Sequence, residues 1–270
     1  MQNRQNPVRL FISDMDHTLL DSHSVVSREN LDAIAEFTAS GGLFTVASGR
    51  SPRAIEIYPE LVRQINAPAI TSNGGILWDF GTERCKMKRT LPDGLTPVLT
   101  SLLARFPELG LAAYAGVDGF FQFRSNDEIE DLIRRERRPA QATFPQMMPH
   151  ELSKFLIAGR HNVLLEAETF LKPLLNGRAD TVFSEDIFLE IMPKGVSKGA
   201  ALCVLMEQLS LTPGQVVALG DGMNDLELLR TAGTGVAVAN AVPTLRAAAD
   251  AVVGSNDEHA AAQCIRKFCL

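Results

Sequence analysis

The sequence predicts an α/β fold, a doubly wound, Rossmann-like parallel sheet into which a second, α+β segment is inserted. Residues 8–12 form an apolar run without polar alternation, which is typical of a strand buried on both faces of a parallel sheet. Strand and helix patterns alternate up to residue 71 and again after Gly195. Between these stretches hairpins and helices mix, so the alternation is lost there.

The N-terminal part predicts a βαβαβ unit. The first strand is followed by a helix that Ser27 caps and that runs to about Ser40. Further strands are expected at 43–47 and 69–71, with a helix opened by Ser51-Pro52 between them. A hairpin around Gly81 completes this part.

The pattern changes at Arg89, and mixed hairpins and helices predict a separate α+β domain over residues 89–187. In chain order we expect a helix around 98–103, strands 111–115 and 119–123, a charged helix 127–138, a Pro-interrupted stretch to 149, strand 154–158, helix 163–175, and strands 181–184 and 187–191.

The first pattern returns at Gly195. Ser197 caps a helix with an apolar stripe, and Cys203 within that stripe is expected to lie in the core. A strand at 216–219 follows, then a helix to Arg230, a strand at 236–239, a helix from Pro243, a strand at 251–253 and a last helix. The core domain is therefore predicted to be discontinuous, over 1–88 and 188–270.

Composition and charge exclude some classes of function. The chain has 270 residues, 46% of them hydrophobic and 21% charged, and a net charge of −6, which argues against binding to nucleic acid or to anionic membranes. No apolar run is long enough to span a bilayer, and no apolar signal core precedes the first strand. We expect a cytoplasmic protein, with a monomer slightly favoured and the oligomeric state left open.

The first strand ends at two carboxylates, Asp14 and Asp16, that share one face unless the chain turns between them. Two like charges that close repel each other unless one is protonated or a cation lies between them. Other strand and helix ends supply Ser48-Gly49, Lys198 and the segment Gly220 to Asp225. The ends of parallel strands lie along one edge, where open α/β sheets bind their ligands.

These residue types suit phosphoryl transfer, which needs a nucleophile, a cation and donors around the phosphate. Asp14 can be the nucleophile, and Asp14 and Asp221 a pair of ligands for Mg²⁺. Asp16 can move protons, Lys198 can offset negative charge, and Ser48 with the Gly49 amide can bind phosphate. Each has a structural alternative on its own: a turn, a helix cap or a solvated lysine.

The four segments together resemble the motifs of the haloacid dehalogenase (HAD) superfamily. Asp14-Met15-Asp16-His17-Thr18 resembles its DxDxT motif, Ser48 its Ser/Thr motif, Lys198 its lysine motif, and Gly220 to Asp225 its GDxxND motif. The long insert between the second and third motifs resembles the type IIB cap of the Cof-type branch. Asn73-Gly74-Gly75 resembles that branch's NGA segment.

The resemblance implies a role for each motif residue. Asp14 would be the nucleophile and a metal ligand, and Asp16 the general acid/base and a ligand through its backbone carbonyl. Asp221 would complete the metal ligands, with Asp225 in or near the layer behind them. Ser48, Gly49, Lys198 and Asn224 would contact phosphate. Two residues depart from the pattern: His17 replaces a usual Gly, and Ser48 a common Thr.

The leading hypothesis is a Mg²⁺-dependent phosphatase of small phosphorylated metabolites, with sugar phosphates the first class. A phosphosugar mutase of the same superfamily is the alternative, with cap arginines to bind a second phosphate. A receiver-like phospho-acceptor signalling protein is a third reading, disfavoured by Asp16 and by chain length. The residues considered for leaving-group or second-phosphate binding in the cap are Tyr114, Arg124, Arg134, Arg160 and His161.

Overall fold

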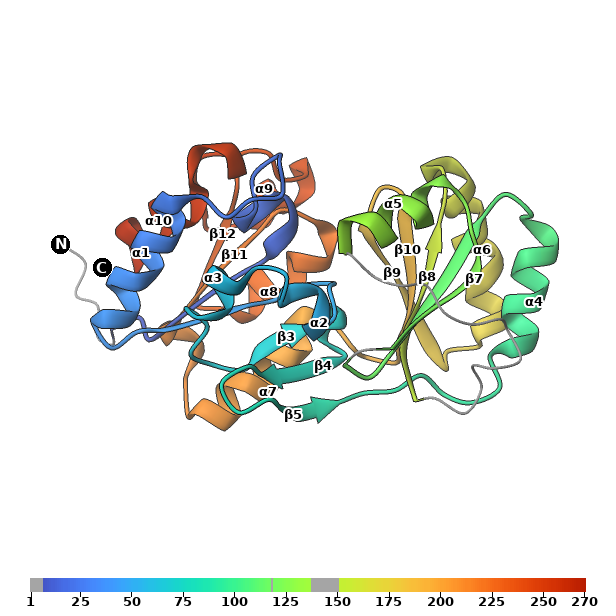
Figure 1. Ribbon diagram of the computed structural model, residues 1–270, viewed down its shortest axis with the longest axis horizontal. Helices are drawn as coiled ribbons and strands as arrows, with labels where there is room; N and C mark the ends of the chain where they lie inside the picture. The colour runs from blue at the N-terminus through green and yellow to red at the C-terminus, as the bar shows by residue number, and fades with distance from the viewer. Residues whose placement is uncertain (1–6, 118, 137–150) are drawn as a thin grey trace. The chain divides into compact units, whose positions relative to one another are not determined.

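The computed structural model describes residues 7–117, 119–136 and 151–270 (Figure 1). The chain divides into two compact units. The core unit contains the described residues up to Gly49 together with 58–87 and 197–270. The cap unit contains 50–57 and the described part of 88–196.

A parallel sheet forms the centre of the core unit, as the apolar runs predict. Its strands are β1 (Leu10–Ser13), β2 (Leu43–Val46), β11 (Val216–Gly220), β12 (Thr234–Ala237) and β13 (Ala251–Val252), in the order β13-β12-β11-β1-β2. Every residue of β1 and β11 is buried, because helices cover both faces of the sheet. The chain winds outward in opposite directions from the pair β1 and β11, which therefore mark the topological switch point.

Helices flank this sheet, and local capping sets where they begin. Ser27 Oγ accepts a hydrogen bond from Asn30 N at the start of α1 (Arg28–Ala39), and Ser197 Oγ accepts from Ala200 N at the start of α7 (Lys198–Leu209). Both caps confirm the sequence predictions. The remaining core helices are α3 (Pro59–Val62), α8 (Leu226–Thr231), α9 (Pro243–Ala248) and α10 (Ala260–Phe268). Figure 1 shows α1 beside α10, and α7 packs on α8.

The third strand differs from the expectation of a continued parallel sheet. β3 (Ala69–Thr71) makes a single parallel bridge, Ala47 to Ile70, and otherwise pairs antiparallel with β4 (Ile76–Asp79). The turn at Ser72–Gly74 reverses the chain directly after β3, so the next strand returns along it. β5 (Arg84–Lys88) adds to β4 and gives a second small sheet, β3-β4-β5, which includes the hairpin expected around Gly81.

The cap unit has the α+β order expected from the sequence. Its main elements are α4 (Thr96–Arg105), β6 (Gly110–Ala115), β7 (Gly119–Arg124), α5 (Asp127–Glu136), β8 (Leu152–Ala158), α6 (His161–Leu175), β9 (Ala179–Glu185) and β10 (Phe188–Pro193). The antiparallel sheet has the order β7-β6-β8-β10-β9. α4 and α6 cover one face through a large apolar cluster, and α5 covers the other. The proline-interrupted stretch expected at 139–149 lies outside the described residues.

Two expectations need correction. The predicted boundary at 187/188 is wrong because β10 pairs with β8 and β9, so the cap unit continues to Val196. Residues 50–57, which include α2 (Pro52–Ile55), also group with the cap unit. Cys203 is exposed rather than in the core, because α7 buries the face that carries Ala201, Leu202 and Leu205.

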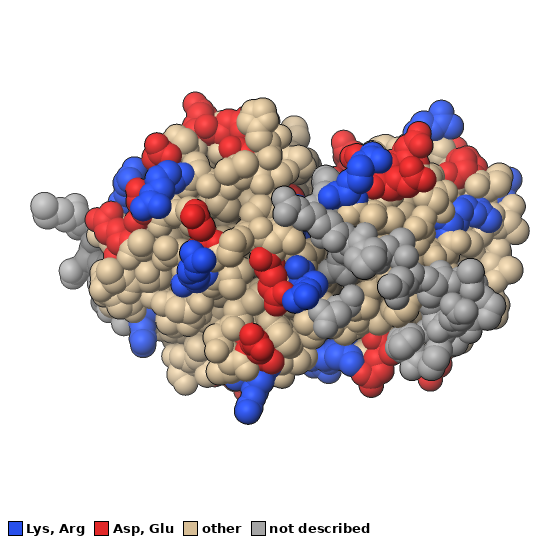
Figure 2. Space-filling view, in the orientation of Figure 1, with Lys and Arg blue, Asp and Glu red and all other residues tan. Residues whose placement is uncertain are grey.

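The surface carries both signs of charge. On the face in Figure 2, acidic and basic side chains are interspersed. Several form ion pairs, such as Arg28 with Asp32 at 2.9 Å within α1. Along the described stretches of chain, no helix has the length and apolar character needed to cross a membrane.

Candidate active site

Three neighbouring strands of the core sheet end in residues that the sequence analysis singled out. Asp14 follows β1, Ser48 follows β2 by one residue, and Asp221 follows β11 directly. The backbone N–H of Asp14 donates to Leu219 O at 2.8 Å, which fixes the start of the loop after β1 against β11. The candidate site therefore lies at the switch point of the parallel sheet, where such folds bind ligands.

Lys198 enters this site from the first turn of α7. Its Nζ donates to Asp14 Oδ1 at 2.6 Å and to Asp225 Oδ1 at 2.6 Å, and the lysine side chain is 1% exposed. The neighbouring residue must be a glycine: a Cβ on Gly199 would lie 2.6 Å from the carbonyl oxygen of Glu227. The close packing of α7 on the start of α8 thus sets the position of Lys198.

The loop after β11 is arranged around Asp225. Its Oδ2 accepts hydrogen bonds from the backbone N–H groups of Asp221 and Gly222, both at 3.0 Å. A Cβ on Gly220 would lie 2.6 Å from the Asp225 carboxyl carbon, so the loop requires glycine there. Both carboxylate oxygens of Asp225 are thus engaged by protein donors, and this residue supports the loop.

Asp221 is oriented by a residue to which the sequence analysis gave no role. Thr18 Oγ1 donates to Asp221 Oδ1 at 2.8 Å, and Thr18 is fully buried. The only sequence signal for Thr18 was its place at the end of the first motif, because the contact spans 203 positions. Carboxylate oxygens of Asp221 and Asp14 lie within 4.8 Å of each other.

The cluster places three carboxyl groups around one ammonium group. Oxygens of Asp14, Asp221 and Asp225 lie within 4.8 Å of one another, and only Lys198 is bonded to the cluster as a cation among the described residues. Burial and the Asp225 charge raise the pKa of Asp14 well above its usual value, and burial with Asp225 raises the pKa of Asp221 to about 6.

The same cluster favours the charged form of Lys198. Burial alone would lower the pKa of Lys198, but the charges of Asp14 and Asp225 outweigh it and raise the pKa. Lys198 is therefore held as a cation, and one positive charge faces three carboxyl groups. A divalent cation fits this donor set, because Asp225 is fully engaged while Asp14 and Asp221 offer hard oxygen ligands.

Asp16 lies in an irregular turn, Met15–Leu19, and outside the cluster that Asp14, Asp221 and Asp225 form. It is half-buried, and the next residue, His17, is exposed with φ 58° and ψ 9°. This left-handed conformation favours glycine, which gives a physical reason for the glycine usual at this position. Asn240 Nδ2 donates to His17 O at 2.8 Å and supports the strained turn.

Ser48, Gly49 and Asn224 are joined by a residue noted before only for its resemblance. Asn73 N donates to Ser48 O at 3.0 Å, and Asn73 Oδ1 accepts from Asn224 Nδ2 at 3.1 Å. A Cβ on Gly49 would approach Asn73 Nδ2 to 3.2 Å. The structure thus brings the expected phosphate contacts of β2 and β11 together through Asn73.

In the cap unit, several of the residues considered for substrate binding already have structural partners. Arg124 Nη1 donates to the carbonyl oxygens of Leu103, Phe106 and Pro107 at the end of α4. His161 Nδ1 lies 2.9 Å from Asp186 O. The other candidates are Tyr114, which is 1% exposed, Arg134, which pairs with Asp131, and Arg160, the N-cap residue of α6.

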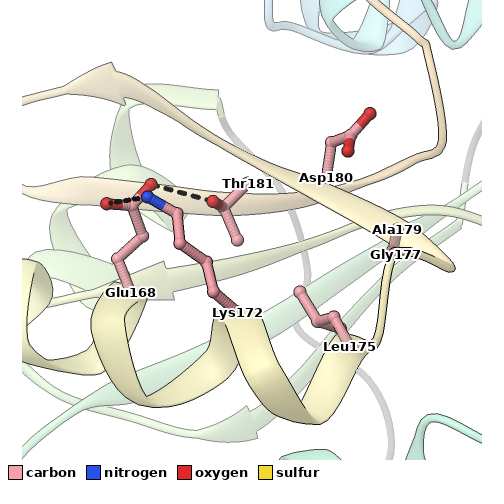
Figure 3. A pocket seen from close by; sticks show the side chains of 7 residues that line it. All are labelled: Glu168, Lys172, Leu175, Gly177, Ala179, Asp180 and Thr181. Carbon is pink, nitrogen blue, oxygen red and sulfur yellow. Dashed lines mark hydrogen bonds and ion pairs between the residues drawn. The ribbon is translucent and has the colours of Figure 1, made fainter.

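A cavity of about 350 Å³ lies within the cap unit, between α6 and β9 (Figure 3). Two of its charged side chains pair with each other: Lys172 Nζ lies 3.0 Å from Glu168 Oε2. Thr181 Oγ1 also donates to Glu168 Oε1 at 2.8 Å. None of its lining residues belongs to the carboxylate cluster of the core unit. The cavity is therefore separate from the carboxylate cluster.

Comparisons with known proteins agree with the motifs. A sequence model of haloacid dehalogenase-like hydrolases matches residues 11–265. An HMP-PP phosphatase of Escherichia coli O6:H1 is 30% identical over 241 residues, which cover 88% of this chain and 87% of that protein. The 5-amino-6-(5-phospho-D-ribitylamino)uracil phosphatase YcsE of Bacillus subtilis is 25% identical over 276 residues, which cover 100% of this chain and 99% of that protein.

A solved structure gives the same result for the fold. A haloacid dehalogenase-like hydrolase from Bacteroides thetaiotaomicron superposes with a TM-score of 0.85 at 28% identity, covering 96% of this chain and 99% of that one. The resemblance that the four motifs predict is confirmed.

Proposed function

We propose that this chain, which belongs to the haloacid dehalogenase-like hydrolase family, is a phosphatase that releases phosphate from small phosphorylated metabolites through a phospho-aspartate on Asp14. The observation that carries the proposal is the buried cluster in which Lys198 binds Asp14 and Asp225 beside Asp221. It combines a carboxylate nucleophile with a fixed positive charge and cation ligands, which phosphoryl transfer requires.

Two displacements at phosphorus would follow. In the first, a carboxylate oxygen of Asp14 attacks phosphorus, the bond from phosphorus to the leaving oxygen breaks, and Asp16 gives that oxygen its proton. In the second, Asp16 takes a proton from water, the water oxygen attacks phosphorus, and the bond to Asp14 breaks to release phosphate. The position of Asp16 outside the carboxylate cluster supports its assignment to proton transfer.

We propose that Ser48, the Gly49 amide, Lys198 and Asn224 bind the phosphoryl oxygens. Mg²⁺ is the proposed cofactor, held by Asp14, Asp221 and the backbone carbonyl of Asp16, with Asp225 behind these ligands. The ion, when bound, would neutralise charge on the phosphoryl group, and Mg²⁺ suits a site of few carboxylates completed by phosphate and water. The close approach of three carboxyl groups to one another, with Lys198 bonded to two of them, supports a divalent cation at this site.

Sugar phosphates are the first substrate class to test, and residues of the cap unit would select among them. The names of the two relatives give HMP-PP and an aminouracil phosphate as substrates of those proteins, so we expect a compact phosphorylated metabolite here as well. A cytoplasmic location is proposed with it, because the cysteines are free thiols, as is usual in a reducing compartment.

The test is a panel of phosphorylated metabolites, assayed for phosphate release with Mg²⁺. Release from at least one sugar monophosphate without a bisphosphate activator is the expected result. An isomerised sugar phosphate formed only with a bisphosphate activator would instead indicate the mutase. A phospho-protein that persists for minutes without product would indicate a receiver-like role, and no release from any member would overturn the proposal.

A further inference from the structure

The turn between β3 and β4 carries unusual backbone strain. Ser72, Asn73 and Gly74 are consecutive and all have positive φ, at 50°, 53° and 98°. A non-glycine residue in this region costs about 1–2 kcal/mol, and Ser and Asn occupy it here side by side. All three residues are buried, so packing and hydrogen bonds around the turn must hold this conformation.

The turn contacts three segments of the candidate site. A Cβ on Gly74 would lie 2.2 Å from Ser197 O, so the turn abuts the residue that caps α7 and precedes Lys198. Asn73 N donates to Ser48 O, at the end of β2. Asn73 Oδ1 accepts from Asn224 Nδ2, in the loop after β11. One strained turn therefore bridges elements that are far apart in the sequence.

The geometry points to Asn73 as a positioning residue for phosphate binding, acting through Asn224. Asn73 Oδ1 accepts one N–H of the Asn224 side-chain amide and thereby fixes how that amide is rotated. The loop after β11 then sets the direction of the other N–H. A donor fixed before the ligand arrives needs no reorganisation when charge develops on the phosphoryl oxygens. This inference rests on the proposed function, because it concerns how the same site holds phosphate.

The left-handed backbone allows a variant that removes the Asn73 side chain without straining the main chain. Asn73→Gly removes the side chain, while glycine keeps φ 53° without strain. Its matched control is Ser72→Gly, one residue earlier at φ 50°, because Ser72 Oγ has no hydrogen-bond partner among the described residues. A merely structural role of the turn would affect both variants alike.

The assay uses p-nitrophenyl phosphate with Mg²⁺, and inorganic phosphate as an inhibitor. We expect Asn73→Gly to lose about 10- to 100-fold in kcat/KM. We expect its inhibition by phosphate to weaken in parallel, while Ser72→Gly keeps both values within about twofold. Thermal midpoints close to the wild type in both variants would show that the loss is not unfolding. Wild-type kinetics and phosphate inhibition in Asn73→Gly would overturn the inference.

A double-mutant cycle tests the route through Asn224. If Asn73 acts by orienting Asn224, the double variant Asn73→Gly/Asn224→Ala should lose no more kcat/KM than Asn224→Ala alone. Multiplied losses would contradict that route. If the wild type does not turn over any phosphate ester, the proposed function fails by itself, and Asn73 is then judged by inorganic phosphate binding in calorimetry: equal affinity in wild type and Asn73→Gly would overturn its role.

Discussion

Lys198 Nζ lies 2.6 Å from Asp14 Oδ1, and both side chains are buried, although the two residues are 184 positions apart. The same ammonium group binds Asp225, so one cation stabilises the carboxylates of both Asp14 and Asp225. In a buried site the loss of such a cation leaves uncompensated charge, which costs more free energy than the pair itself provides. Lys198 is therefore expected to contribute both to the stability of the core unit and to the proposed chemistry.

Lys198→Met should lower the free energy of unfolding by about 3–5 kcal/mol, because Asp14 and Asp225 lose their common partner. Thermal or urea unfolding measures it. The matched control is Lys194→Met, four residues earlier, where the lysine is 62% exposed and pairs with Asp180 at 2.7 Å. An exposed pair is worth about 0–1 kcal/mol, so equal losses in both variants would contradict the buried cluster.

Asp14→Asn should reduce turnover by at least about 10³-fold, because the amide is a poor nucleophile. The fold should survive, and the thermal midpoint of the metal-free protein should stay the same or rise, since one of three mutually repelling carboxylates is removed. Asp79→Asn is the control. Burial opposes ionisation of Asp79, but hydrogen bonds from Thr82 together with Lys86 outweigh it and lower the pKa of this carboxyl, so its charge stabilises the fold slightly. That variant should keep full activity and lose a little stability.

Chelation should abolish phosphate release, and added Mg²⁺ should restore it. Because the ion binds the folded state, Mg²⁺ at about ten times its dissociation constant should add about 1.4 kcal/mol to stability. Asp221→Asn should lose this thermal shift, whereas Asp79→Asn should retain it. A full shift in Asp221→Asn would place the ion elsewhere, and activity without any metal would remove Mg²⁺ from the mechanism.

His17 offers a test of backbone strain beside Asp16. At φ 58°, His17→Gly should leave stability unchanged or raise it by up to about 1 kcal/mol, while His17→Ala should be about 1 kcal/mol less stable than His17→Gly. Denaturant unfolding of the two variants measures the difference. Equal stability of the glycine and alanine variants would mean that the turn relaxes out of the left-handed region.

The cap unit contains a second buried ion pair, Lys154 Nζ to Glu190 Oε1 at 2.6 Å, with the ammonium group 4.5 Å from the centre of the Tyr114 ring. Lys154→Met alone should cost about 3–5 kcal/mol, because it leaves a buried carboxylate. The double variant Lys154→Met/Glu190→Leu should recover most of that loss. Thermal unfolding of the three proteins checks it, and a double variant as unstable as the single one would contradict the argument.

Most secondary structure could be predicted because its signals are local. Ser27 and Ser197 cap helices where the sequence indicates, and the strand ends at Asp14, Ser48 and Asp221 follow from apolar runs that stop at polar residues. The boundary at 187/188 was wrong, since which sheet a strand joins depends on partners far along the chain. Cys203 was misplaced because the helix it lies on is apolar on most sides, which hides the buried face.

The contacts inside the site were harder to predict. Ser72-Asn73-Gly74-Gly75 is a recognisable turn signal, but its sequence does not indicate left-handed conformations at two non-glycine residues or a contact with Asn224, 151 positions away. The bond from Thr18 to Asp221 is equally non-local. Residue types could be read from the motifs, whereas the hydrogen bonds that orient them depend on the folded core.

The strand order also constrains how the protein is made. β1 lies between β2 and β11, and β11 follows it by about 200 residues, so a ribosome adding about 5–20 residues per second supplies the second neighbour only about 10–40 s later. During that time one edge of β1, whose four residues are all buried in the folded protein, is open to other chains. A transcript truncated before residue 216 should therefore yield an aggregation-prone fragment and not a smaller enzyme.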